Sequence, residues 1–261
     1  MLNLARMASA VLTAFAVFAV VWPALAAAQA PTPTPIPPAH VSDPLADLAL
    51  GESVTLSNET TITRWANSND PAPIRVAPGN SAPQITKLRY LTEDGLPEVY
   101  LVLEGKVDIA GEPWLHVRIP MRPNHRTGWV HADTLSQLHV VTTQMVISRK
   151  AKRAKLFRAG RKIWEAPVGI GKSATPTPLG KFWIRERLKG GGGVYGPWAF
   201  GTSAYSNLSD WKKGGVVGIH GTNQPGLIPG APSHGCVRVR NNKIRQLAKL
   251  MPIGTALEVI P

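Results

Sequence analysis

A single cysteine, Cys236, occurs in the 261-residue chain, and it ends the motif Ser233-His234-Gly235-Cys236. A lone thiol cannot form an internal disulfide, so the chain must fold without one. Secreted proteins usually pair their cysteines, and an odd one indicates an intermolecular bond or a reactive group. The alternative is that Cys236 is a small buried apolar residue. The histidine and the small residues beside it favour a reactive thiol.

The N-terminus predicts export. Arg6 precedes an apolar stretch over residues 8–21, and a run of small residues follows. A basic start, a short apolar core and an A-x-A site are typical of a secretory signal peptide. The stretch is shorter than the roughly 20 residues that a spanning helix needs, although an uncleaved anchor remains an alternative. We therefore expect a signal peptide over residues 1–28, with cleavage near Ala26 or Ala28.

Composition divides the remainder of the chain. Residues 29–57 begin with a proline-rich run, which predicts an extended linker that holds the rest off a surface. From Ala30 to Leu138, 8 Lys and Arg stand against 12 Asp and Glu, a net charge of −4. Residues from His139 to Pro261 include 20 Lys and Arg and 4 Asp and Glu, a net charge of +16. This break predicts two domains with a boundary near residue 138.

The basic half bears on possible partners. Lys and Arg crowd residues 149–162. Such a cluster can bind nucleic acid, but an exported protein rarely meets any, so we expect no nucleic-acid partner. Attraction to an anionic cell-wall polymer or membrane surface is the interpretation we favour. A simple solvated strand–turn–strand face is the alternative.

The first domain is predicted to be all-β. Short apolar runs such as Trp114–Ile119 alternate with polar residues, and proline and glycine clusters separate them. The segments Ile74–Pro78, Trp114–Val117 and Thr127–Val130 resemble bacterial SH3-like domains, which are small barrels appended to cell-wall enzymes. The resemblance implies such a barrel over residues 58–137. Modules of this kind bind wall peptide or position a catalytic domain, and we interpret their histidines (His116, His125 and His131) as surface or packing residues.

The second domain, over residues 138–261, is also predicted to begin as strands. Lys155–Arg158 and Arg161–Glu165 should form a hairpin across Ala159-Gly160. One clear helix is expected from about Asn242 to Met251, capped by Asn241 or Asn242 and stopped by Pro252. The four-glycine run at residues 190–193 is either a lid or an ordinary surface loop. The predicted fold is thus mainly β, with one helix near the C-terminus.

The pairing of Cys236 with His220, 16 residues upstream, carries the predicted chemistry. A free thiol with a pKa of about 8.5 is only a few per cent ionised at neutral pH, so a histidine within reach would take its proton. The amides of Gly235 and Cys236 could form an oxyanion hole. No acidic residue lies near either motif, so a backbone carbonyl, such as that of Gly221, would have to orient the imidazole.

These motifs resemble the L,D-transpeptidase family, also called the YkuD domain. The matching segments are His220-Gly221-Thr222, the block from Ser233 to Arg238, and the upstream turn Thr177-Pro178-Leu179-Gly180. The resemblance covers about residues 138–261 and implies a β-rich fold. It implies that Cys236 is the nucleophile and His220 the base. The residues expected to shape the pocket or the oxyanion hole are Gly221, Ser233, His234 and Gly235. Arg238 could bind a substrate carboxylate or hold the loop.

The resemblance also implies a reaction and a location. Cys236 would attack the third residue of a peptidoglycan tetrapeptide stem, release D-Ala, and pass the acyl group to an amine of a neighbouring stem as a 3→3 cross-link. No metal or nucleotide cofactor is needed for this chemistry. The protein would act in the cell wall, the periplasm or at the extracellular face of the membrane.

Several alternatives remain at this point. His220, His234 and Cys236 could be ligands of a catalytic zinc, although no carboxylate base is nearby. A papain-like wall hydrolase would place the cysteine before the histidine, the reverse of the order here. The chain could also bind the wall without catalysis, or use water as the acceptor and act as an L,D-carboxypeptidase.

Overall fold

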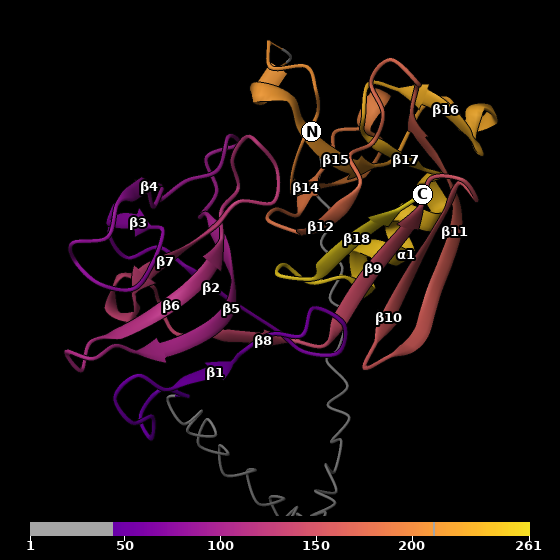
Figure 1. Ribbon diagram of the computed structural model, residues 1–261. Coiled ribbons are helices and arrows are strands. Elements are labelled where there is room, and N and C mark those ends of the chain that lie inside the picture. The colour runs from indigo at the N-terminus through magenta and orange to yellow at the C-terminus, as the bar shows by residue number, and fades with distance from the viewer. Residues whose placement is uncertain (1–43, 211) are drawn as a thin grey trace, which may run out of the picture. The chain divides into compact units, whose positions relative to one another are not determined.

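The computed structural model describes residues 44–210 and 212–261, whose strands form two β-sheets (Figure 1). The predicted signal peptide and the first part of the predicted linker lie outside the described residues. Within the described ranges, no helix is both long enough and apolar enough to cross a membrane.

The first sheet has eight strands in the order β4-β3-β7-β6-β5-β2-β8, with β1 paired to β5. Neighbouring strands run antiparallel throughout. The strands are β1 (Ser53–Thr55), β2 (Thr63–Asn67), β3 (Pro73–Arg75), β4 (Gln84–Lys87), β5 (Val99–Val107), β6 (Pro113–Arg118), β7 (Thr127–His131) and β8 (His139–Val141). A short 3-10 helix, Ala132–Thr134, follows β7.

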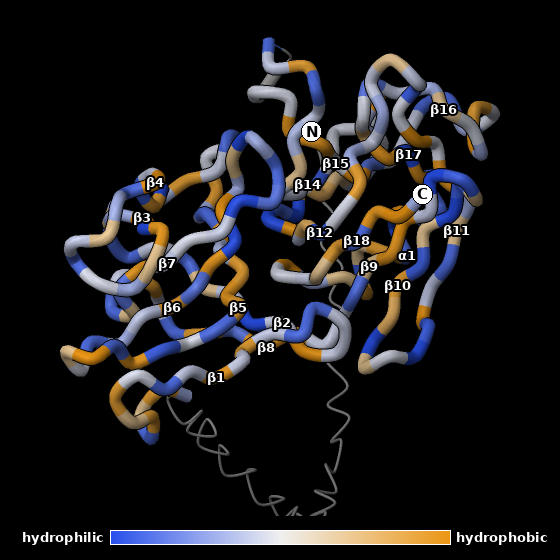
Figure 2. The backbone as a smooth tube through the Cα atoms, in the orientation of Figure 1, coloured by the Kyte–Doolittle hydropathy of each residue, from blue (hydrophilic) through white to orange (hydrophobic). Residues whose placement is uncertain are grey.

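Strand β5 is apolar on both faces, which explains its continuous run of apolar residues. Tyr100 and Val102 point into the core of the first sheet. Val99 and Leu101 point the other way, against Trp183 of the second sheet. Alternate side chains of a strand face opposite sides, so a strand covered on both sides needs apolar residues at every position. The run shows as an orange stretch on β5 in Figure 2.

The first sheet extends beyond the residues that we expected to form its domain. β1 lies before residue 58, and Leu45 and Leu56 are buried in the core of this sheet. At the other end, β8 pairs with β2 after residue 137. The described part of the predicted linker therefore packs on the first sheet.

The second sheet has ten strands in the order β12-β18-β9-β10-β11-β17-β15-β14-β13, with β16 paired to β11. Its strands are β9 (Thr143–Ser148), β10 (Arg153–Arg158), β11 (Arg161–Gly171), β12 (Gly180–Trp183), β13 (Leu188–Lys189), β14 (Trp198–Tyr205), β15 (Val216–His220), β16 (Gly230–Ser233), β17 (Val237–Val239) and β18 (Ala256–Ile260). Three short 3-10 helices lie in its loops: Gly193–Tyr195, Lys212–Gly215 and Pro225–Leu227.

The expected hairpin between β10 and β11 is present. Ala159 and Gly160 form its turn with φ angles of 46° and 76°. Positive φ at both central residues matches the right-handed twist of the flanking strands, which favours tight two-residue turns of this kind.

The one α-helix of the described chain, α1 (Asn241–Leu250), lies close to its predicted position. Ile244, Leu247 and Ala248 are buried in the core of the second sheet. The predicted asparagine cap is wrong, because Arg240 occupies the N-cap position and no side chain caps the helix. The predicted fold class, mainly β with one helix near the C-terminus, is confirmed.

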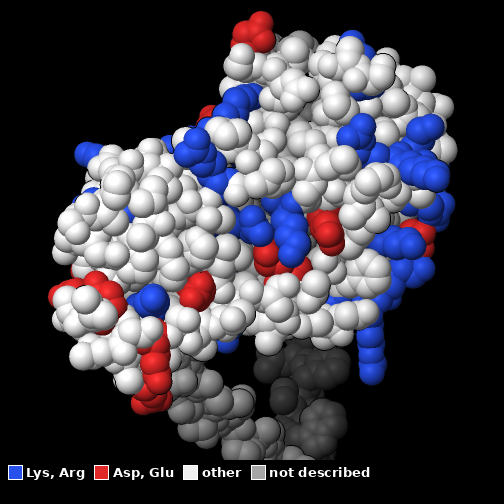
Figure 3. All heavy atoms as spheres, viewed as in Figure 1, with Lys and Arg blue, Asp and Glu red and all other residues white. Residues whose placement is uncertain are grey.

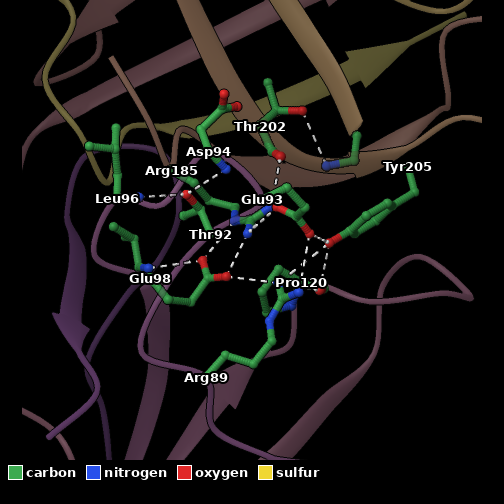
Figure 4. A network of polar contacts seen from close by, with 12 residues as sticks. Arg89, Thr92, Glu93, Asp94, Leu96, Glu98, Pro120, Arg185, Thr202 and Tyr205 are labelled. Atoms are coloured by element: carbon green, nitrogen blue, oxygen red, sulfur yellow. Dashed lines mark hydrogen bonds and ion pairs between the residues drawn. The ribbon is translucent and has the colours of Figure 1, made fainter. Parts of the chain in front are cut away.

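A buried ion network joins the two sheets (Figure 4). Arg185, which follows β12, is 1% exposed and donates to both carboxylate oxygens of Glu98 at 2.7 and 2.5 Å. It also donates to Glu93 at 2.9 Å, and Arg89 donates to Glu98 at 2.8 Å. A buried charge is costly unless it is paired and hydrogen-bonded, and here each charge is.

Replacing Glu98 with glutamine should therefore destabilise the protein. Glu98→Gln keeps the shape of the side chain but removes the negative charge that pairs with Arg185 and Arg89. The free energy of unfolding should therefore fall by about 3 kcal/mol. Urea unfolding measures the loss. The matched control is Glu165→Gln, which removes a carboxylate that pairs with Arg153 and Lys162 near the surface. The control should leave the unfolding midpoint nearly unchanged, and equal losses in both variants would contradict the assignment.

Candidate active site

Parallel pairing of β15 with β17 brings the two predicted catalytic residues together. The register places Ile219 opposite Val237 and His220 opposite Arg238. Cys236 immediately precedes β17, so the same register continued by one residue sets it beside Gly218. Residues opposite one another in a sheet share a face, as do residues two apart in one strand. Cys236, His220 and Arg238 therefore lie on the same face of the sheet.

Cys236 is partly buried and held by a backbone amide. The amide of Gly218 donates to Cys236 Sγ at 3.4 Å. A Cβ built on Gly218 would lie 3.3 Å from the Phe200 carbonyl oxygen and 4.0 Å from His220 Cδ2, so this position borders the imidazole.

His220 is 5% exposed, and its ring is fixed by the neighbouring backbone. Its Nδ1 lies 2.6 Å from the carbonyl oxygen of Gly221, which is where the sequence suggested an orienting carbonyl. A carbonyl only accepts hydrogen bonds, so Nδ1 carries the proton and Nε2 is left free to act as a base. The Tyr195 ring and the imidazole pack in a T-shaped arrangement, with ring centroids 5.0 Å apart.

Ser233 and Thr177 hold the turn that carries Cys236. The Ser233 hydroxyl donates to the Cys236 carbonyl at 2.5 Å and accepts from the Gly235 amide at 3.2 Å. The hydroxyl of Thr177, 1% exposed, donates to the Gly235 carbonyl at 2.8 Å and accepts from the Gly171 amide at 3.0 Å. The Gly235 amide thus donates within the turn, and the expected oxyanion hole formed by the Gly235 and Cys236 amides stays a prediction.

Gly221 is needed for close packing. A Cβ at this position would lie 2.5 Å from Asn241 Oδ1 and 2.9 Å from Gly196 Cα. Asn241 accepts a hydrogen bond from the Thr222 amide at 2.9 Å. Asn241 or Asn242 was expected to cap the helix, and the contact of Asn241 with the segment after His220 was not predicted. No local signal distinguishes the two uses of this side chain.

Arg238 and His234 lie in different surroundings. Arg238 donates to Gln224 Oε1 at 3.0 Å, and its Nε is buried with no hydrogen-bond partner among the described residues. His234 is exposed, whereas His220 is buried. Within residues 44–210 and 212–261, no three or more His, Cys, Asp or Glu are grouped so that they could hold a metal ion. The three ligands of the zinc alternative are thus not brought together.

Burial keeps the thiol and the imidazole neutral. Desolvation lowers the pKa of His220 to about 4, against the opposing effect of the Gly221 carbonyl, and the positive charge of Arg238 lowers it further. Desolvation raises the pKa of the Cys236 thiol, although the Gly218 amide and Arg238 oppose this rise. At neutral pH the resting site therefore holds mainly a neutral thiol and a neutral imidazole, and only a small fraction of the pairs is charged.

Comparison with known proteins places this half of the chain. A family model described as the L,D-transpeptidase catalytic domain matches residues 142–260. A putative L,D-transpeptidase of Bacillus subtilis is 32% identical over 121 residues, which are 46% of this chain and 68% of the relative. A second one, from Bacillus licheniformis, is 32% identical over 118 residues, 45% of this chain and 66% of the relative. The chain thus spans about two thirds of the length of these curated relatives.

Solved structures show more distant likenesses. The catalytic domain of the Enterococcus faecium L,D-transpeptidase is 21% identical with a TM-score of 0.34, over 45% of this chain and 96% of that one. An L,D-transpeptidase from Mycobacterium smegmatis is 13% identical with a TM-score of 0.38, over 57% of this chain and 90% of that one.

The neutral resting pair predicts a particular pH profile for alkylation of Cys236 by iodoacetamide. The rate should stay low and level across neutral pH, because a small constant fraction of the pairs exists as thiolate and imidazolium. It should fall as the pH drops through about 4, where His220 becomes protonated, and rise in the alkaline range, where the thiol ionises. The rate is measured by intact-protein mass spectrometry.

His220→Ala is the control for this profile. It should remove the level region and leave only the alkaline rise. A fast plateau with no alkaline rise in the unmodified protein would show a resting ion pair and contradict the neutral assignment.

Proposed function

The chain belongs to the L,D-transpeptidase family, and from that premise we propose that it is an exported cysteine acyltransferase which forms 3→3 cross-links between peptidoglycan stem peptides. The observation that carries the proposal is the arrangement of Cys236 beside the Gly218 amide and on the same sheet face as His220, whose Nδ1 is held by Gly221. An unpaired thiol with an oriented neutral base is the arrangement that thiol acyl transfer needs.

In the first step, Cys236 Sγ attacks the carbonyl of the third residue of a tetrapeptide stem while its proton passes to His220 Nε2. The amide of Cys236 donates to the oxygen that becomes negative. The carbon–nitrogen bond to the terminal D-Ala then breaks, and the leaving amine takes the proton back from His220. A thioester on Cys236 remains.

In the second step, the side-chain amine of a neighbouring stem attacks the thioester. His220 Nε2 accepts a proton from this amine, the carbon–sulfur bond breaks, and the thiolate recovers the proton. A new amide links the third residues of two stems, and the enzyme returns to its neutral resting state. Neither step needs a metal ion or a nucleotide.

Arg238 is assigned to the substrate carboxylate. Its buried Nε has no hydrogen-bond partner in the described part of the chain, although buried polar groups are normally paired. A carboxylate at the stem's C-terminus would satisfy it and complement its charge. Gln224 holds the other end of the guanidinium group.

Charge and sequence support a position at the wall. Lys and Arg side chains gather over β10 and β11 on the face shown in Figure 3. A surface of this kind is attracted to anionic polymers or anionic membranes. With the predicted signal peptide at residues 1–28, it supports export to the cell wall, the periplasm or the outer face of the membrane. We retain residues 58–137 as a proposed SH3-like domain and 138–261 as the proposed catalytic domain.

Acylation by a disaccharide-tetrapeptide tests the proposal directly. Intact-protein mass spectrometry should show a D-Ala-released adduct on Cys236, followed by a cross-linked dimer. Cys236→Ala should abolish the adduct, because no other thiol exists in the chain, and His220→Ala should slow it by at least about 100-fold. Release of D-Ala without a dimer would instead establish an L,D-carboxypeptidase. Full cross-linking by Cys236→Ala would overturn the mechanism, and the absence of any adduct would favour a wall-binding protein.

The role of Arg238 is tested with a pair of substrates. Arg238→Met should raise the KM for the tetrapeptide by about 10-fold or more, because the substitution removes a charge-assisted hydrogen bond to the substrate. With a stem whose C-terminal carboxylate is amidated, the same variant and the unmodified protein should have similar KM values. An equal effect of the substitution on both substrates would show that Arg238 only holds the loop.

A further inference from the structure

The end of β14 is held by a turn of the first sheet. Asn124 lies between β6 and β7, and its Nδ2 donates to the Tyr205 carbonyl at 2.9 Å. The Tyr205 amide donates in return to Asn124 Oδ1 at 2.9 Å. The carboxamide thus satisfies both backbone groups of Tyr205, as a neighbouring strand would.

Arg122, from the same turn, holds the residues that follow. Its Nη2 donates to the carbonyl of Ser206 at 2.9 Å and to that of Leu208 at 3.2 Å. The guanidinium carbon lies 4.8 Å from the centre of the Tyr205 ring. A planar group that binds two carbonyls and covers an aromatic ring fixes a loop better than a flexible ammonium group can.

The Tyr205 side chain ties this contact to the buried ion network. Its hydroxyl lies 2.6 Å from Glu93 Oε1 and 3.0 Å from the carbonyl of Pro120 (Figure 4). Tyr205 is 6% exposed, so neither its ring nor its hydroxyl is free to move into solvent. Asn124 therefore fixes the backbone at the end of β14, Arg122 fixes the backbone of the residues that follow, and Glu93 fixes the Tyr205 side chain.

On its other side, this segment supports the catalytic turn. A Cβ built on Gly235 would lie 3.3 Å from Ser206 Cβ and 3.5 Å from Val217 Cγ2, so the turn packs directly against Ser206. The Ser206 amide donates to the Gly215 carbonyl at 2.9 Å, immediately before β15 begins. Movement of Ser206 would therefore displace Gly235, next to the nucleophile, and the start of the strand whose Gly218 amide binds Cys236 Sγ.

We propose that Arg122 and Asn124 are positioning residues for Cys236, acting through Tyr205 and Ser206. Neither touches the thiol or the imidazole. They hold Tyr205 and Ser206, and the turn that carries Cys236 packs against Ser206. Residues of the first sheet would thus contribute to the reactivity of a nucleophile on the second. This assignment rests on the proposed role of Cys236 but not on the identity of its acyl acceptor.

The size of the effect follows from geometry. Displacement of reacting groups by about 1 Å can cost about 100-fold in rate, whereas binding of a substrate by other parts of the site is less sensitive. Arg122→Ala and Asn124→Ala should therefore slow acylation of Cys236 by the tetrapeptide about 10-fold to 100-fold, with KM changed by no more than about twofold. The pH profile of Cys236 alkylation should change as well, since the environment that raises the thiol pKa and lowers that of His220 is disturbed.

The experiment uses the full chain and three comparisons. Arg75→Ala is the matched control, because Arg75 also donates to a backbone carbonyl, that of Ala82, but within the first sheet. Arg122→Lys should behave as Arg122→Ala does, since lysine cannot bind two carbonyls and cover the ring. Asn124→Asp keeps the acceptor for the Tyr205 amide and should lose less activity than Asn124→Ala.

Urea unfolding separates positioning from folding. Rates are expressed per folded molecule, and the milder Arg122→Lys and Asn124→Asp variants serve if an alanine variant does not fold. Unchanged acylation and an unchanged alkylation profile in folded variants would overturn the proposal, and so would losses equal to those of Arg75→Ala. If the unmodified protein forms no acyl adduct, the proposed function fails, but the alkylation profile of Cys236 still decides whether Arg122 and Asn124 position the thiol.

Discussion

The parallel pairing of β15 with β17 is the constraint on which the active site depends. Antiparallel neighbours can be joined by a tight turn, but parallel strands need a crossover connection. The 16 residues from Gly221 to Cys236 provide it with a 3-10 turn and strand β16, which pairs with β11, in place of a helix. The pairing delivers Cys236 to the face that carries His220, although the two residues lie far apart in the chain.

Burial decides how the pair works. A thiolate and an imidazolium in this site would both be poorly hydrated, and among the described residues the Gly218 amide donates to the sulfur. Arg238 favours the thiolate but disfavours the imidazolium, so it does not stabilise the charged pair as a whole. In the proposed reaction, the pair becomes largely charged only when the substrate carbonyl is present to accept the negative charge. The fixed Nδ1 contact of His220 keeps the cost of that step low, because the base needs no reorientation before it takes the proton.

Local features were readable from the sequence, and contacts between distant segments were not. The alternation in Trp114–Ile119 and the turn at Ala159-Gly160 depend on residues close together in the sequence, and a strand and a turn form at those positions. Asn241 at the start of α1 illustrates the limit, because its side chain accepts a hydrogen bond from the Thr222 amide and does not cap the helix. In the same way, the motif around Cys236 suggested the Gly235 amide as an oxyanion-hole donor, but not that this amide would donate to Ser233.

The difference in charge between the two halves of the chain also provides ion pairs that join the two sheets. The excess of acidic residues before position 139 includes Glu93 and Glu98, whose carboxylates neutralise Arg185 from the basic half. Burial raises the pKa of Glu93, yet the charge of Arg185 and the hydroxyl of Tyr205 lower it to about 2, so this carboxylate stays ionised at neutral pH. Trp183 adds an apolar contact with Val99 and Leu101 beside the network, and its indole donates to the Val99 carbonyl at 2.7 Å. Separating the sheets would expose this apolar surface and leave Arg185 without its carboxylate partners, so both apolar burial and charge pairing hold the two sheets together. The proposed positioning of Cys236 by Arg122 and Asn124 depends on this contact.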